Sequence, residues 1–221
     1  MIFVDLDNTL YNQEQYLKFV FKEIGKHLKK RTNINKEIIY KFLFDIVKAK
    51  TMSFPIFDYL VKYFRLDIDP RELVELYREF SVLFLKSNKL CLYESALKLL
   101  KRCDVIIYTE GNEEIQIKKI ENIEKNYKFK LNYIIVKNKL DKGNVKIFRK
   151  YNPVAYIGDD VFRDFYIPNM LNILTIRVLT GLYKNIPNNI VKKMYRPKIT
   201  VKNLSYLRFL YYESNVHKCS S

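Results

Sequence analysis

The fold is decided by the stretch IFVDLDNT, residues 2–9. Its first half is β-branched and aromatic, so it predicts a short buried strand that ends at an acidic turn. Asp5 and Asp7 stand two positions apart in this turn, and Thr9 follows them. Once the strand ends and the chain turns, both carboxylates can reach one site. The stretch therefore supplies both a core strand and the first candidates for chemistry.

A helical segment follows the acidic turn. Apolar residues recur at helical spacing from about residue 13 to residue 87, and the pattern breaks near residues 33–35 and at 67–70. Asp69 before Pro70 is a favourable cap with proline at the first helical position. We therefore predict a four-helix insert over residues 15–87.

Beyond the insert, β-branched runs alternate with helical segments. This alternation predicts an α/β fold with a Rossmann-like parallel sheet and helices on both faces. We assign residues 1–14 and 88–213 to this core and expect a flexible polar tail at 214–221. The strands expected after the first are residues 103–109, 132–136, 153–160, 173–178 and 198–201.

The chain is strongly basic. Among its 221 residues, 40 Lys and Arg face 24 Asp and Glu, which leaves a formal charge of +16. This charge favours anionic partners, either a phosphorylated small molecule or a nucleic acid. The basic residues are scattered through amphipathic stretches mixed with glutamate, so a solvated basic surface is the simpler interpretation.

The composition argues against a membrane protein and a disulfide-rich one. No apolar stretch approaches the ~20 residues of a membrane-spanning helix, and the start MIFVDLD lacks the regions of a signal peptide. The three cysteines lack the spacing of a zinc site or of a disulfide framework. We therefore expect a cytoplasmic globular protein with no membrane partner.

Polar residues gather at three of the predicted strand ends. Ligands of open parallel sheets bind outside the carboxyl ends of the strands. Crowded carboxylates raise each other's pKa unless a cation neutralises them, and Mg²⁺ suits a few carboxylates that share it with water and substrate oxygens. The residues concerned are Asp5, Asp7 and Thr9 after the first strand, Thr109 and Gly111 after the second, and Gly158, Asp159, Asp160 and Asp164 after the fourth.

These motifs, in this order, resemble those of the haloacid dehalogenase (HAD) superfamily over nearly the whole chain. The first family motif, Asp-x-Asp-x-Thr after a buried strand, matches Asp5 to Thr9. The second, a Thr or Ser after a hydrophobic strand, matches Thr109, and the fourth, an acidic pair, matches Asp159 and Asp160. The insert over residues 15–87 has the position and size of the family's helical cap, which closes over the site and selects the substrate.

The resemblance implies a role for each matching residue. Asp5 would be the nucleophile, and Asp7 would be the general acid/base that also offers a backbone oxygen to the metal. Asp5, Asp7 and Asp159 would hold Mg²⁺. The remaining assignments are the phosphoryl contact by Thr109, loop support and substrate binding by Thr9, substrate binding by Gly111, and an outer contact by either Asp160 or Asp164.

The third family motif is a lysine that pairs with the nucleophile and the phosphate. Several lysines follow the strand at 132–136. We prefer Lys142, because it starts the helix expected at 143–150 and precedes Phe148 by six residues, as in the family's Lys-Pro-Asp-Pro-x-x-Phe version. Lys139 lies closer to the strand end and is the alternative.

The resemblance implies phosphoryl transfer, because the family's dehalogenases lack a counterpart of Asp7. We expect a Mg²⁺-dependent phosphohydrolase that acts on a small phosphorylated metabolite through an aspartyl-phosphate intermediate. A phosphomutase is the alternative within the family. A nucleic-acid-binding or interaction protein on the same fold, suggested by the +16 charge, is the alternative outside enzymes. A calcium loop at Asp159 and Asp160 is disfavoured, because Phe162 stands where an oxygen ligand is needed.

Overall fold

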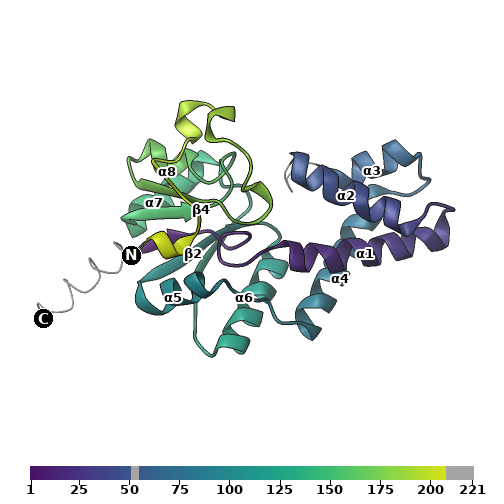
Figure 1. Cartoon of the computed structure of the whole chain (residues 1–221), viewed down its shortest axis with the longest axis horizontal. Coiled ribbons are helices and arrows are strands. Elements are labelled where there is room, and N and C mark those ends of the chain that lie inside the picture. The colour runs from purple at the N-terminus through teal and green to yellow at the C-terminus, as the bar shows by residue number, and fades with distance from the viewer. Residues whose placement is uncertain (51–54, 208–221) are drawn as a thin grey trace, which may run out of the picture. The chain divides into compact units, whose positions relative to one another are not determined.

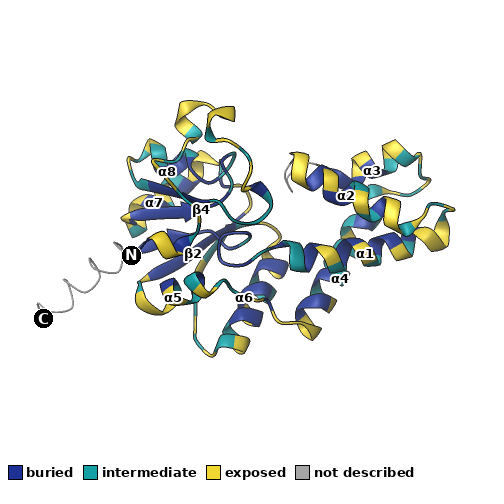
Figure 2. Cartoon of the chain, in the orientation of Figure 1, coloured by how far each residue is buried: buried dark blue, intermediate teal, exposed yellow. Residues whose placement is uncertain are grey.

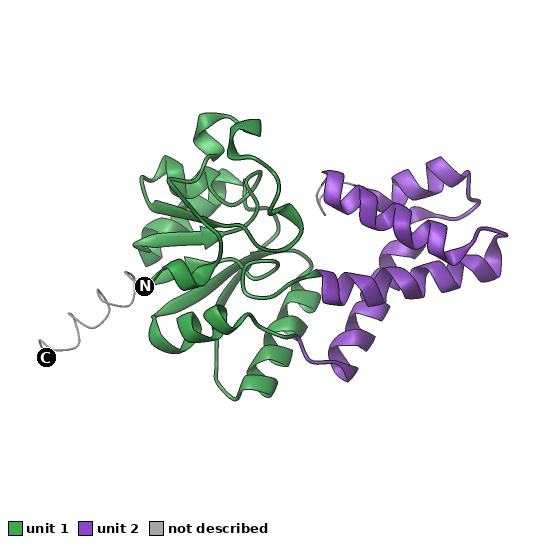
Figure 3. Ribbon diagram, viewed as in Figure 1, with its two compact units in different colours: residues 1–13, 91–221 green, residues 14–90 purple. Residues whose placement is uncertain are grey.

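The computed structural model describes residues 1–50 and 55–207 and divides the chain into two compact units (Figure 3). One unit contains Met1–Gln13 and the chain from Cys91 onward, and the other contains Glu14–Leu90. The sequence predicts these boundaries after residues 14 and 87. The predicted flexible tail, residues 214–221, lies outside the described residues.

A six-stranded sheet forms the centre of the first unit (Figure 1). All its neighbouring strands pair in parallel, which confirms the predicted α/β fold with a parallel sheet. The strand order is β3-β2-β1-β4-β5-β6. The strands are β1 (Ile2–Val4), β2 (Val105–Glu110), β3 (Asn132–Val136), β4 (Ala155–Gly158), β5 (Leu174–Val178) and β6 (Ile199–Val201).

The first strand lies in the middle of the sheet and is buried throughout. Val4 is in register with Ile107 of β2 on one side and with Ile157 of β4 on the other. The strand order changes direction beside β1, and such a switch point is where open α/β sheets bind their ligands. The turn that follows β1 therefore opens at the place where a site is expected.

Helices cover both faces of this sheet (Figure 1). On one side, α7 and α8 enclose an aromatic core in which Phe3 stacks on Tyr108 with 5.5 Å between ring centroids. On the other side, α5 and α6 bury their apolar stripes, and their outer surfaces are exposed (Figure 2). The helices are α5 (Glu94–Arg102), α6 (Glu113–Tyr127), α7 (Val145–Tyr151) and α8 (Tyr166–Met170), with 3-10 turns η1 (Lys142–Asn144), η2 (Gly181–Tyr183), η3 (Asn188–Ile190), η4 (Lys193–Tyr195) and η5 (Leu204–Tyr206).

The described residues of the second unit form four helices, the number that the sequence predicts. Val20, Ile24 and Leu28 line the buried side of α1, which packs on α2 and α4. Asp69 caps α4 by accepting a hydrogen bond from the N–H of Arg71 at 2.8 Å, with Pro70 at the first helical position. The helices are α1 (Glu14–Arg31), α2 (Lys36–Lys50), α3 (Ile56–Phe64) and α4 (Pro70–Ser87). Across the described part of both units, no helix is long and apolar enough to cross a membrane.

Candidate active site

The turn after β1 is held in place from several sides. The N–H of Asp5 donates to the carbonyl oxygen of Ile157 at 2.8 Å, which ties the end of β1 to β4. Asn8 takes a left-handed backbone conformation with φ of 61°. Its carbonyl oxygen accepts a hydrogen bond from Thr180 Oγ1 at 2.6 Å. Because the turn is fixed in this way, Asp5 has a defined position at the carboxyl edge of the sheet.

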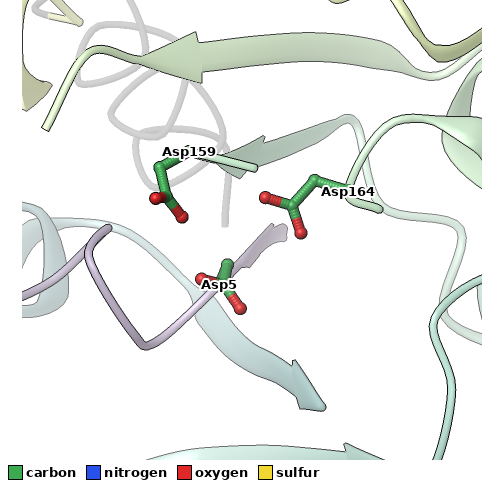
Figure 4. A group of neighbouring side chains, drawn as sticks. All are labelled: Asp5, Asp159 and Asp164. Carbon is green, nitrogen blue, oxygen red and sulfur yellow. The ribbon is translucent and has the colours of Figure 1, made fainter. Parts of the chain in front are cut away.

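Three buried carboxylates meet at this edge: Asp5, Asp159 and Asp164. Each offers an oxygen that lies within 4.8 Å of an oxygen of the other two. Figure 4 shows the three side chains pointing toward one another: Asp5 directly follows β1, Asp159 directly follows β4, and Asp164 lies in the loop beyond. Thr9 joins two of them, because its hydroxyl lies 3.3 Å from Asp5 Oδ2 and 3.4 Å from Asp159 Oδ1.

A lysine ammonium lies against this cluster, and it belongs to Lys139. Lys139 Nζ donates to Asp5 Oδ1 and lies 2.7 Å from Asp164 Oδ1, and its side chain is 6 % exposed. Glu110 holds the loop that follows β3, because its carboxylate accepts a hydrogen bond from the N–H of Lys139 at 2.8 Å. Glu110 also forms an ion pair with Arg163. Lys139, the lysine closer to the strand end and the alternative in the prediction, is therefore the one that contacts Asp5.

Lys142, the lysine that the sequence analysis preferred, lies in η1 and is exposed. The spacing to Phe148 placed it at a helix start, and it does stand there, after Asp141, whose side chain caps the turn by accepting from Gly143 N at 2.8 Å. The residues at the start of this turn are exposed, whereas Lys139, which precedes it, is buried and contacts Asp5 and Asp164. The position of Lys142 thus corrects the prediction that it pairs with Asp5.

Asp164, and not Asp160, joins the carboxylate cluster. Asp164 Oδ1 accepts from Tyr156 Oη at 3.0 Å, and its Oδ2 accepts from the N–H of Asp160 at 2.8 Å. Asp160 turns its own carboxylate to the N–H of Phe162 at 2.8 Å. Asp160 therefore shapes the loop, and Asp164 anchors Lys139.

The cluster has three carboxylates and contacts one lysine ammonium, so its negative charge is not fully neutralised. Burial raises the pKa of Asp5 to about 7, although Lys139 opposes the rise. Burial, with Asp5 and Asp164 nearby, raises the pKa of Asp159 well above its ordinary value. Asp159 Oδ2 is also buried with no hydrogen-bond partner among the described residues. A buried carboxylate oxygen without a donor is costly unless a cation binds it, and hard oxygen ligands suit Mg²⁺. The donor set therefore fits the metal.

The carboxylate of Asp7 lies outside this cluster. Both its oxygens contact Lys119 Nζ of α6, at 2.8 and 2.9 Å, and Gln116 Nε2 donates to Oδ2 at 3.1 Å. Tyr11 donates to Oδ1. Burial alone would raise the pKa of Asp7, but the Lys119 ammonium and these hydrogen bonds lower it below its usual range. The side chain of Asp7 is thus turned to α6, and Asp164 is the third carboxylate of the cluster. The prediction that Asp7 offers a metal its backbone oxygen does not depend on the direction of this side chain.

The fold can be compared with known proteins. No protein-family model matches the chain, and no curated protein matches it. Among solved structures, the HAD-hydrolase YfnB from Bacillus subtilis, bound to magnesium, aligns with a TM-score of 0.68 and 14 % identity over 96 % of this chain and 97 % of its own. A HAD phosphatase from Thermococcus onnurineus aligns with a TM-score of 0.58 and 16 % identity over 95 % and 96 %. The chain has the fold of the HAD-like hydrolases. A dehalogenase in an intermediate complex also shares it, with a TM-score of 0.54 and 13 % identity over 95 % of both chains.

Two further predicted residues lie at the next strand end of the HAD-like fold. Thr109 is buried near the end of β2, beside β1, and is in register with Ile135 of β3. Gly111 is exposed in the turn that follows, with a φ of 149° that side-chain-bearing residues rarely adopt. Its N–H donates to the carbonyl oxygen of Val136 at 3.2 Å. The turn leads into α6, which carries the partners of Asp7.

Several residues at the site were not found from the sequence. Lys119 and Gln116 are ordinary letters in a Lys- and Glu-rich helix, and no pattern marks them. Arg177 did leave a signal, since it is a charged residue within an apolar strand. It is buried, and its Nε donates to the carbonyl oxygen of Asp159 at 3.0 Å. Burial lowers the pKa of Arg177, while the nearby Asp159 opposes this.

Proposed function

We propose that the chain is a Mg²⁺-dependent phosphohydrolase that cleaves a small phosphorylated metabolite through an aspartyl-phosphate at Asp5. The observation that carries the proposal is the cluster of Asp5, Asp159 and Asp164, which a single buried ammonium, that of Lys139, leaves short of positive charge. Two solved structures with the same fold support it. One is bound to magnesium, and the other is a phosphatase.

Asp5 and Asp159 would hold the metal through their carboxylates. By the family resemblance, the backbone oxygen of Asp7 would join them. Bound Mg²⁺ would neutralise the cluster and polarise the oxygens of the phosphoryl group. Asp164 already has donors on both oxygens, from Tyr156, Lys139 and the N–H of Asp160. Its role is therefore to hold Lys139 and the loop.

The chain's own residues account for both chemical steps. In the first, an Asp5 oxygen bonds to phosphorus and the bond to the leaving oxygen breaks. Asp7, which its low pKa keeps ionised in the free chain, passes to the leaving oxygen a proton that it takes from the phosphate monoanion of the substrate. In the second, water attacks the phosphorus of the aspartyl-phosphate, Asp7 takes the proton of that water, and phosphate leaves with Asp5 restored. Lys139 offsets negative charge beside the transferring group throughout.

Phosphoryl transfer is favoured over dehalogenation by the surroundings of Asp7. A halide leaving group needs no proton, whereas an alkoxide does. The side chain of Asp7 is 17 % exposed, and Lys119 contacts both its oxygens. The Lys119 ammonium stabilises the carboxylate that remains after Asp7 has given up its proton, so a protonated Asp7 is a strong acid in the first step.

A phosphatase assay tests the proposal. The wild-type chain and Asp5→Asn are assayed with an aryl phosphate and with a panel of phosphorylated metabolites, each with Mg²⁺ and with excess EDTA. We expect Mg²⁺-dependent release of phosphate by the wild type, with a phosphoryl adduct on the peptide that contains Asp5 when the reaction is quenched in acid. Activity in Asp5→Asn above a tenth of wild type, or activity unaffected by EDTA, would overturn it.

A further inference from the structure

One face of α6 is turned to the acidic turn after β1. Gln116 and Lys119 are three residues apart on this helix, and residues at that spacing lie on the same side of it. Both are buried, although they are polar. The helix start is fixed by Asn112, whose side chain accepts the N–H of Ile115 at 3.2 Å. The two polar side chains are therefore delivered from a rigid element.

These side chains converge on Asp7. Lys119 Nζ lies 2.8 and 2.9 Å from its two oxygens, and Gln116 Nε2 lies 3.1 Å from Oδ2. Tyr11, four residues along the turn, donates to Oδ1. Gln116 Nε2 also donates to the carbonyl oxygen of Glu110 at 2.7 Å, which fixes the direction of its amide. Each oxygen of Asp7 thus has at least two donors, and the orientation of the carboxylate is determined.

Lys119 differs from the other lysines of its helix. Its side chain is 3 % exposed, whereas that of Lys118 is 32 % exposed and makes a surface pair with Glu114 at 4.0 Å. Burying an ammonium is costly, and apolar packing would join a helix to a turn at lower cost. A buried lysine aimed at one carboxylate of the candidate site is therefore better explained by what it does to that carboxylate.

We propose that Lys119 is a positioning residue that fixes the direction from which Asp7 meets the leaving-group oxygen, with Gln116 and Tyr11 supporting it. The inference rests on the proposed function, because it concerns the acid of that reaction. Misplacing a catalytic group by about 1 Å can lower a rate about 100-fold. Lys119 contacts both carboxylate oxygens of Asp7 and is the charged group among its donors. Its loss should therefore allow the Asp7 carboxylate to change its orientation.

The dependence of the rate on the leaving group tests this. Lys119→Met is compared with wild type on an aryl phosphate with a good leaving group and on an alkyl phosphate with a poor one. Only the alkyl substrate needs the proton in the first step, so we expect kcat to fall at least about 10-fold with it and less than about 3-fold with the aryl substrate. Equal losses on both substrates would overturn the proposal, because a merely structural role predicts them.

Conservative and matched variants sharpen this test. Lys119→Arg keeps a cation and should recover part of the alkyl phosphate activity. Tyr11→Phe keeps the ring and removes only the hydroxyl that donates to Asp7, so it should show the same substrate dependence more weakly in a chain that still folds. Lys118→Met removes a partly exposed lysine of the same helix, whose side chain pairs with Glu114, and should leave both rates unchanged. If Tyr11→Phe also lowers both rates equally, the proposal fails.

A stability measurement separates the failure of this inference from the failure of the proposed function. Urea unfolding midpoints are compared for Asp7→Asn, Lys119→Met and the double variant. If the two side chains interact as described, the double variant should unfold no earlier than the less stable single variant. If the stability losses of the two single variants add fully in the double variant, Asp7 and Lys119 do not interact, and the inference fails even if the enzyme is active. If the losses of stability do not add, but the chain has no phosphatase activity, the interaction between Asp7 and Lys119 is confirmed and the proposed function is refuted.

Discussion

Lys139 Nζ lies 2.7 Å from Asp164 Oδ1 while it also donates to Asp5, so one buried ammonium connects the loops that follow β1, β3 and β4. Burial alone would lower the pKa of Lys139, but Asp164 and Asp5 hold it well above its usual value. The lysine therefore stays charged at every pH at which the protein would work. Its charge opposes part of the repulsion among the three carboxylates and leaves the rest for a metal.

Replacing Lys139 tests which lysine serves the site. Lys139→Met removes the only charge that contacts both Asp5 and Asp164 in the described part of the chain, so kcat/KM should fall by about 100-fold or more. Lys142→Met should retain most activity, because Lys142 is exposed. Steady-state kinetics with an aryl phosphate measure both. A larger loss in Lys142→Met would return the role to Lys142, and circular dichroism checks that Lys139→Met is folded.

The pH dependence of stability follows from the raised pKa values. Asp5 and Asp160 have pKa values of about 7 in the folded chain, raised from 3.8. Between these values the folded state binds more protons than the unfolded one, so the free energy of unfolding falls as the pH rises from 5 to 8. The lowered pKa of Asp7 acts in the opposite sense, but only near and below its ordinary value of 3.8. Urea midpoints in EDTA should therefore decrease from pH 5 to pH 8.

Magnesium should reduce the dependence of the urea midpoint on pH, because a bound cation favours the ionised carboxylates. Asp5→Asn should make the slope in EDTA smaller, because one of the raised groups is gone. A midpoint that rises between pH 5 and pH 8 in EDTA would contradict the described electrostatics.

The sheet and the carboxylates could be predicted because local patterns encode them. The strands are short runs rich in β-branched and aromatic residues. Asp5, Thr9 and Asp159 follow strand ends that a parallel sheet brings to one edge. The lysine could not be chosen in this way. Lys139 and Lys142 lie three positions apart in the short connection between β3 and α7. The hydrogen bond from Lys139 N to Glu110, which holds Lys139 in place, joins residues 29 positions apart. The partners of Asp7 lie on α6, 112 positions away for Lys119, and no short motif encodes them.

The orphaned oxygen of Asp159 predicts a metal-linked gain in stability. Mg²⁺ should raise the melting temperature of the wild type, because it gives Asp159 Oδ2 the partner that it lacks among the described residues. Asp159→Asn should lose most of this gain and, in EDTA at pH 8, should be more stable than the wild type by about 1–2 kcal/mol. Asp104→Asn, at an exposed aspartate, is the control and should behave as the wild type. Thermal unfolding with and without Mg²⁺ measures all three, and an equal Mg²⁺ shift in Asp159→Asn would exclude Asp159 as a ligand.

Gly158 is required by the close approach of Asp164. A Cβ atom at Gly158 would lie 2.2 Å from Asp164 Oδ2, the oxygen that accepts the N–H of Asp160. Gly158→Ala should therefore displace the Asp164 carboxylate from Lys139, cost about 1–3 kcal/mol of stability and lower activity by more than that loss of folded protein explains. Gly143→Ala is the matched control, because the atoms nearest to its Cβ would belong to the exposed Asp141 side chain, the first of them at 3.2 Å.

The double variant Gly158→Ala/Asp164→Ala separates the clash from the chemistry. Removing the Asp164 carboxylate relieves the overlap, so the unfolding midpoint should recover relative to Gly158→Ala alone. Activity should not recover, because Lys139 then lacks the anchor that holds it beside Asp5. Recovery of both would mean that Asp164 only fills space. Recovery of neither would mean that the backbone of β4, rather than the Asp164 side chain, rejects a Cβ at this position.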